Sequence, residues 1–143
     1  MTNKIFAGVD EVGRGCLAGP VISCALILKK NINKELLRDS KTISFKKRIE
    51  IAKHIKKNSW YAIGSASVNE IDKYNIFNAT LLSMERAVKK LKKKPNTFLI
   101  DGTHAPKKIK NSKTVIKGDQ KIKCISAASI VAKVYRDLYM IRL

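Results

Sequence analysis

The sequence predicts an α/β fold in which helices flank a mixed central sheet. Three strand-like runs come early in the chain, and strands then alternate with helices, which is typical of an α/β layer. Hydrophobic residues make up 45% of the 143 residues, enough for a core. That length suits one compact domain, and we find no internal repeat or long linker, so a single domain over residues 1–143 is expected.

The first half of the chain carries two strand signals followed by a helix signal. Residues 4–9 are apolar and end at Asp10-Glu11, and residues 20–28 are a second apolar run close enough to pair with the first as a hairpin. Ser44 is placed to cap a helix, because apolar residues follow it at helical spacing. Those residues are Phe45, Ile49, Ala52 and Ile55.

A third strand and the longest helix follow. Residues 59–67 have strand character, and the helical pattern from Asn75 to Lys93 ends at Pro95-Asn96. Its predicted inner stripe consists of Ile76, Thr80, Met84, Ala87, Val88 and Leu91. The last third of the chain predicts short strands at 97–100 and 113–117 and a closing helix at 125–140.

The chain is strongly basic. Its net charge is +19, from 30 Lys and Arg against 11 Asp and Glu. Such a balance favours nucleic acid as a partner, because basic side chains release counterions from phosphates, although a generic basic surface explains the charge as well. No apolar run reaches the ~20 residues of a membrane helix. Without such a run or a signal-peptide pattern, the sequence predicts a soluble cytoplasmic protein with no membrane association. Three cysteines without a CxxC pair predict neither a disulfide framework nor structural zinc.

Four acidic residues stand out because each follows an apolar run or adjoins a glycine: Asp10, Glu11, Asp101 and Asp119. Sites in open α/β sheets gather beyond the carboxyl ends of strands. Carboxylates that meet there repel one another unless a cation neutralises them, and oxygen ligands suit Mg²⁺ or Mn²⁺. Two such ions roughly 4 Å apart would support phosphodiester cleavage. The alternative is that one or two of these acids only cap loops.

Asp10 and Glu11 are neighbours, which poses a geometric problem. Successive strand residues point to opposite faces, so both can serve one site only if the strand has ended by Glu11 or if Glu11 offers its carbonyl. Gly13 and Gly15 permit a turn there, and Arg14 between them can reach a phosphate. Taken alone, the Gly-Arg-Gly segment is equally compatible with a structural turn.

Five motifs in order closely resemble those of the ribonuclease HII family, over nearly the whole chain. They are GVDEVGRG with LAGPV (residues 8–21), DSK (39–41), NIFNAT (75–80), DG (101–102), and KGD with the SAASIVAKV helix behind it (117–134). The resemblance implies a ribonuclease H-like fold and an endoribonuclease. Such an enzyme hydrolyses the RNA strand of RNA/DNA hybrids and incises 5′ of ribonucleotides embedded in DNA, by two-metal-ion catalysis that leaves 5′-phosphate ends.

The resemblance also assigns roles to individual residues. It implies that Asp10, Glu11, Asp101 and Asp119 are catalytic and hold Mg²⁺ or Mn²⁺. It implies that Gly13, Arg14 and Gly15 sense the ribose 2′-hydroxyl, the group that distinguishes RNA from DNA. Lys41, Asn78 and Lys133 become expected substrate contacts, with RNA/DNA hybrid duplexes and ribonucleotide-containing DNA as the partners.

The sequence departs from the family at its end, because members usually continue beyond the position of Leu143. That further segment carries a stacking tyrosine which neither Tyr135 nor Tyr139 matches. We therefore expect a C-terminally shortened ribonuclease H-like catalytic domain. One alternative is a basic hybrid-binding module that cleaves little or not at all. Another is a general RNA-binding protein, which explains the charge but not the ordered acids.

Two residues near the motifs are left open by the sequence. His104 follows Asp101 in a loop and is read either as a proton shuttle or as an ordinary loop histidine. Asp137 is expected to be structural, paired with Arg136 or another neighbour on its helix.

Overall fold

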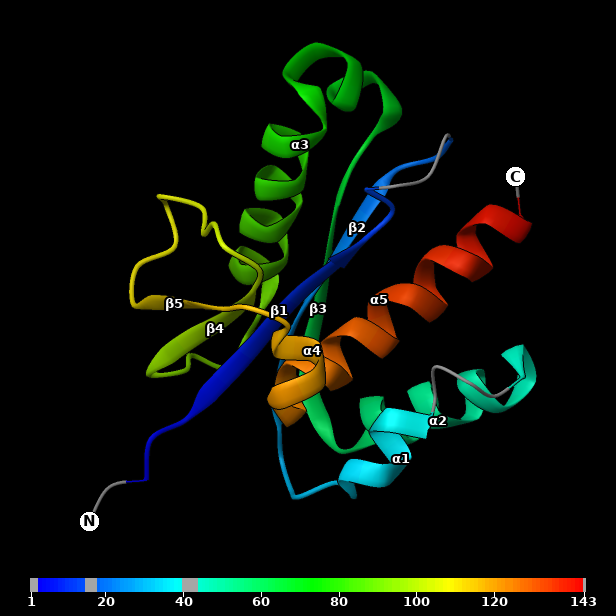
Figure 1. Cartoon of the computed structure of the whole chain (residues 1–143), viewed down its shortest axis with the longest axis vertical. Coiled ribbons are helices and arrows are strands. Elements are labelled where there is room, and N and C mark those ends of the chain that lie inside the picture. Colours follow the sequence, from blue (N-terminus) through cyan, green and yellow to red (C-terminus); the bar gives the residue numbers. More distant parts are fainter. Residues whose placement is uncertain (1–2, 15–17, 40–43, 143) are drawn as a thin grey trace.

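A mixed sheet forms the centre of the molecule in the computed structural model, which describes residues 3–14, 18–39 and 44–142 (Figure 1). These residues form five strands in the order β3-β2-β1-β4-β5. β1, β2 and β3 are antiparallel neighbours, and β4 and β5 run parallel to β1. The strands are β1 (Phe6–Val12), β2 (Val21–Leu28), β3 (Ser59–Ala66), β4 (Thr97–Asp101) and β5 (Ser112–Val115). The predicted mixed sheet and first hairpin are confirmed.

Helices cover both faces of the sheet (Figure 1). α5 packs on one face together with α1 and α2, and α3 packs on the other face. The helices are α1 (Lys34–Asp39), α2 (Phe45–Lys57), α3 (Val68–Lys90), α4 (Gly118–Lys121) and α5 (Lys123–Ile141). In the described part of the chain, no helix is long and apolar enough to cross a membrane.

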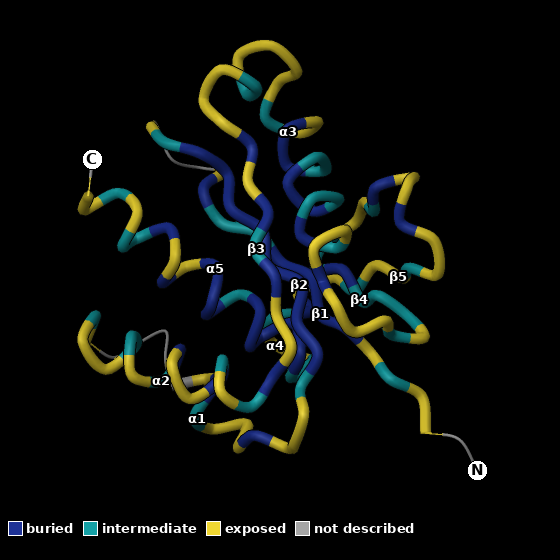
Figure 2. Tube along the Cα trace, turned by 180° about the vertical axis from the view of Figure 1, so that it is seen from behind, coloured by how far each residue is buried: buried dark blue, intermediate teal, exposed yellow. Residues whose placement is uncertain are grey.

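The alternation of side chains along β2 explains the two-sided core. Ile22, Cys24 and Leu26 face α5, whereas Ala25 and Ile27 face α3, and all five are buried. A strand buried on both faces has a continuous apolar sequence, as residues 21–28 do. Figure 2 shows this burial along β1, β2 and the inner side of α5.

The predicted helix caps fit the structure, with one addition. Ser44 caps α2, since its side chain accepts a hydrogen bond from the Lys47 amide. α3 begins at Val68 rather than at Asn75, behind a capping box of Ser67 and Glu70. Its backbone leaves helical geometry at Asn75 (φ 72°), whose side chain accepts from the Asn78 amide at 2.9 Å. Asn75 therefore caps a second segment within α3, which is the start that the sequence pattern predicted.

Two strand boundaries predicted from the sequence are corrected, and one helix was not predicted. β1 continues to Val12 instead of ending at Asp10-Glu11, because its pairing with β2 extends as far as Val12 opposite Ile22. β5 ends at Val115, so Asp119 lies in the short helix α4 rather than directly after a strand. The six-residue α1 was not predicted, since it is too short to establish helical periodicity.

Candidate metal centre

Three acidic side chains from separate elements converge at one edge of the sheet. One carboxylate oxygen each from Asp10, Asp101 and Asp119 lies within 4.8 Å of the other two. β1 and β4 are adjacent and parallel, with Val9 opposite Ile100, so the next residue on each strand is one of these acids. The convergence predicted for Asp10, Asp101 and Asp119 is thus confirmed.

A hydrogen bond between β4 and α4 brings Asp119 to the other two acids. The Gly118 amide donates to Asp101 Oδ1 at 2.6 Å, just after Lys117 turns the backbone through a left-handed conformation (φ 54°). Gly118 is buried, and a Cβ there would lie 2.6 Å from Ile125 Cδ1. The KGD sequence therefore places Asp119 beside Asp101 through this turn, in which a side chain at position 118 would require Ile125 to move.

Asp10 is held between its own strand and α5. Its Oδ1 accepts from the Glu11 amide at 2.8 Å, and Ser129 of α5 lies close enough to lower the pKa of this carboxyl. α5 approaches closely because Gly8, two residues earlier on the same face of β1, has no side chain. A Cβ at Gly8 would lie 2.3 Å from the carbonyl carbon of Cys124. Gly8 thus allows the helix to reach the site.

Burial makes the site costly for negative charge. Asp10 is only 4% exposed, and its pKa is raised to about 8, first by burial and then by the neighbouring carboxylate of Asp101. Hydrogen bonds from the Glu11 amide and Ser129 lower this pKa but do not offset the increase. Three carboxylates in such a place suit a divalent cation, which would neutralise them with the oxygen ligands that Mg²⁺ and Mn²⁺ prefer.

Glu11 faces the other side of the sheet. β1 is still a strand at this position, so its side chain points toward α3 and lines a cleft with Arg14, Phe77 and Asp101. Burial raises the pKa of the Glu11 carboxyl; Arg14 lowers it, and Asp101 raises it further. The structure thus gathers three of the four expected carboxylates and leaves the Glu11 side chain outside the group. A metal contact through Glu11, by its carbonyl or otherwise, stays a prediction.

The Gly-Arg-Gly segment begins beside this cleft. Gly13 has a positive φ of 107° at the end of β1, where a Cβ would meet Arg136 and the Pro20 carbonyl. Arg14 is exposed and lines the cleft of about 250 Å³ with Glu11. Gly15, like Lys41 of the DSK motif, lies outside the described residues. The sensing role of this segment stays a prediction.

Two other expected substrate contacts lie on helices. Lys133 is exposed on α5, with its ammonium 3.8 Å from the Asp137 carboxylate. Asn78 on α3 donates to the carbonyl of Tyr74 and lines a cavity separate from the three carboxylates. Neither position tests the predicted contact with nucleic acid.

Arg136 and Asp137 are adjacent but act separately. Asp137 pairs with Lys133, one turn earlier, and with Arg48 of α2 at 3.9 Å, so the expected helix-neighbour pairing is found with Lys133 rather than Arg136. Arg136 is buried and donates to the carbonyls of Ala18 (2.6 Å) and Pro20 (2.9 Å). Sequence reasoning missed this role, because a buried arginine bound to carbonyls leaves no periodic or charge signal.

His104 lies at the mouth of the cleft that Glu11 and Asp101 line. Its ring stands edge-on to Phe77 with centroids 5.1 Å apart, and its Nδ1 is 2.8 Å from the Thr103 hydroxyl. Both positions are exposed. These contacts are compatible with an ordinary loop residue, and a proton-shuttle role for His104 stays a prediction.

Comparisons with known proteins agree with this architecture. A family model described as Ribonuclease HII matches residues 7–143. A protein named Ribonuclease HII from Pelagibacter ubique (strain HTCC1062) is 59% identical over 142 residues, covering 98% of this chain and 76% of the relative. The crystal structure of ribonuclease H2 from Pyrococcus horikoshii OT3 superposes with a TM-score of 0.81 at 26% identity, over 96% of this chain and 74% of that chain.

One more distantly related structure shares the fold, and its similarity shows the fold alone. The structure of Bst-RNase HIII in complex with Mn²⁺ has a TM-score of 0.75 at 16% identity, covering 97% of this chain and 54% of that chain.

Proposed function

The chain belongs to the ribonuclease HII family of metal-dependent endonucleases, and from that premise we propose that it hydrolyses the RNA strand of RNA/DNA hybrids. Its second proposed substrate is DNA with embedded ribonucleotides, cut on their 5′ side. The observation that carries the proposal is the convergence of Asp10, Asp101 and Asp119 within 4.8 Å. Action in the cytoplasm is part of the proposal.

The three carboxylates are proposed to hold Mg²⁺ or Mn²⁺. They fit such ions because they come from three elements, supply only oxygen ligands and include a buried member whose charge needs a cation. When bound, the ions supply an activated water and stabilise negative charge on the phosphate. Water adds to phosphorus as the bond to the 3′ oxygen breaks, leaving 3′-hydroxyl and 5′-phosphate ends.

The protein's own contribution is to fix the geometry of these ligands. The Gly118 amide orients Asp101, and the Glu11 amide orients Asp10. Both arrangements exist before substrate binds, so little reorganisation is needed during the reaction.

Substrate selection is proposed to depend on groups around these ligands. Gly13, Arg14 and Gly15 would read the ribose 2′-hydroxyl, and Glu11 lies beside Arg14 in the same cleft. Lys41, Asn78 and Lys133 would contact phosphates. The net charge of +19 supports a polyanionic substrate of this kind.

The test is cleavage of an RNA/DNA hybrid with Mg²⁺ or Mn²⁺ by the unmodified chain and by Asp10→Asn, Asp101→Asn and Asp119→Asn. Each substitution should reduce the rate by at least about 100-fold, the effect of losing a group that organises transition-state charge. Glu50→Gln removes an exposed acid of α2 and serves as the control, with an unchanged rate.

Two results would argue against the proposal. Metal-dependent cleavage that persists in all three aspartate variants would show that the chemistry occurs elsewhere. Tight hybrid binding without cleavage by the unmodified chain would favour the alternative, a basic hybrid-binding module.

A further inference from the structure

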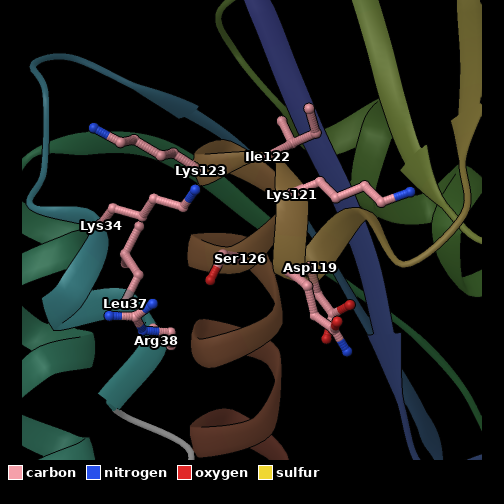
Figure 3. A pocket seen from close by; sticks show the side chains of 9 residues that line it. Lys34, Leu37, Arg38, Asp119, Lys121, Ile122, Lys123 and Ser126 are labelled. Atoms are coloured by element: carbon pink, nitrogen blue, oxygen red, sulfur yellow. The ribbon is translucent and has the colours of Figure 1, made fainter.

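A second cavity adjoins the carboxylate group on the side of α1 and α5. It has a volume of about 460 Å³ and lies between α1 and the first turn of α5 (Figure 3). Asp119 lines it and also belongs to the carboxylate group, so the two sites are contiguous. This cavity is distinct from the cleft of Glu11 and Arg14, which faces α3.

Positive side chains surround the cavity. Lys34 and Arg38 reach it from α1, and Lys123 lines it at the start of α5 with its ammonium extending away from Ser126 (Figure 3). Lys121 extends away from α1 (Figure 3). Among the side chains that the structure describes, which do not include that of Asp39, no carboxylate lies within salt-bridge distance of Lys34, Arg38 or Lys123. The Lys123 ammonium is instead held by a neutral acceptor, Asn31 Oδ1, at 2.7 Å. The cavity therefore keeps its positive charge.

A buried hydroxyl completes the cavity. Ser126 is 7% exposed, and Figure 3 shows its hydroxyl pointing into the space between α5 and α1. Among the hydrogen bonds of the described residues, none uses this hydroxyl. The side chain of Ile122 makes no capping hydrogen bond at the start of α5, so the positive end of the helix dipole is free to attract an anion as well.

Asp119 lines the side of the cavity that is farther from the cations of α1. In Figure 3 the Asp119 side chain lies across Ser126 from Lys34 and Arg38. The apolar side chains of Leu37 and Ile122 line the remaining wall. Cations and a hydroxyl beside an apolar wall fit a phosphate with its attached sugar.

We propose that this cavity, lined by Lys34, Arg38, Lys123 and Ser126, binds a non-scissile phosphodiester of the nucleic-acid substrate. The inference rests on the proposed function and extends it. The strand whose scissile phosphate lies at the three carboxylates continues past Asp119 and places a further phosphate between α1 and α5. This contact fixes the register of the strand at the metal centre.

Binding assays test the proposal without requiring cleavage. The variant Lys34→Gln/Arg38→Gln/Lys123→Gln is compared with Lys89→Gln/Lys90→Gln/Lys92→Gln, which removes the same charge from exposed positions at the end of α3. With EDTA present, we expect the cavity variant to bind an RNA/DNA hybrid at least about 10-fold more weakly. The slope of log K against log salt should fall by about 1 for the lost phosphate. Equal losses in both variants would overturn the proposal.

A chemical scan locates the phosphate. Hybrids carrying one neutral methylphosphonate are bound by the unmodified chain and by both triple variants. In the unmodified chain and the control, neutralising one phosphate beyond the scissile position should weaken binding. In the cavity variant, the same replacement should have no further effect. A penalty that persists in the cavity variant at every position would contradict the proposal.

Two further measurements keep the outcome clear. Ser126→Ala and Arg38→Gln, tested singly with circular dichroism to confirm folding, should each reproduce part of the loss if the triple variant does not fold. These tests measure affinity and not cleavage. If the methylphosphonate penalty disappears in the cavity variant but the unmodified chain does not cleave, the cavity is supported and only the proposed function is contradicted. If the unmodified chain cleaves but the penalty persists in the cavity variant, the proposed function is supported and the phosphate site is contradicted.

Discussion

Asp10 is the residue of the metal centre whose ionisation is made unfavourable by burial. It is buried beside Asp101, and its pKa of about 8 means that the metal-free protein holds a proton there at neutral pH. A cation that binds must displace this proton. The same burial that prepares the site for metal therefore destabilises the folded chain when no metal is present.

Asp10→Asn should stabilise the metal-free protein, increasingly as the pH rises. The folded pKa is raised to about 8 from 3.8, so the native state binds more protons than the unfolded state between these values, and stability falls as pH rises through that window. Asparagine does not titrate. Thermal unfolding in EDTA should therefore show a small difference between variant and parent near pH 4 and a large one at pH 8 or above.

Glu50→Gln provides the control, because Glu50 is an exposed acid on α2. Its difference from the parent should not widen with pH. A constant or shrinking advantage of Asp10→Asn would mean that the Asp10 carboxyl ionises with an ordinary pKa.

α5 packs against β1 and contributes side chains to the metal centre and its surroundings. It places Ser129 beside Asp10 and Ser126 in the neighbouring cavity, and its buried Arg136 binds the chain before β2. All of these depend on how closely α5 lies against β1.

Gly8→Ala should separate α5 from β1. The added Cβ would lie 2.3 Å from backbone atoms of Cys124, which cannot move without shifting the helix. We expect a loss of about 3 kcal/mol in unfolding free energy, measured by urea denaturation, together with reduced cleavage. Ser65→Ala, at an exposed position of β3, should stay within about 0.5 kcal/mol of the parent. A neutral Gly8→Ala would show that the approach is looser than described.

Arg136→Met should weaken the segment between β1 and β2. The guanidinium donates to two carbonyls, and methionine would leave both without this partner at a cost of about 1–3 kcal/mol. Faster hydrogen exchange at the amides of Ala18 and Gly19 would locate the effect. Arg142→Met, on the exposed end of α5, is the control. Unchanged exchange in Arg136→Met would rule out this bracing role.

The whole molecule is a polycation, and its nucleic-acid affinity should reflect that. If ~6 phosphates are neutralised, log K for an RNA/DNA hybrid should fall with log salt at a slope of about −5. Fluorescence anisotropy at several salt concentrations measures this slope. A nearly flat response would indicate that the charge of +19 reflects composition rather than a binding surface.

Local sequence patterns predicted most of the helices and strands and singled out the acids of the metal site. The hairpin of β1 and β2, the Ser44 cap and the second segment of α3 followed from periodicity and capping chemistry, which act over a few residues. Asp10 and Asp101 could be picked out because each follows an apolar run, and adjacent strands bring such positions together.

The tertiary structure determined on which face of the sheet each functional side chain lies. Glu11 lies in the cleft beside α3, outside the group of three carboxylates, because pairing with β2 keeps β1 extended to Val12. The sequence alone left this open. The burial of Arg136 and the cavity between α1 and α5 also depend on segments far apart in the chain. Such contacts arise only when helices pack on particular faces of the sheet, and no local window of sequence records them.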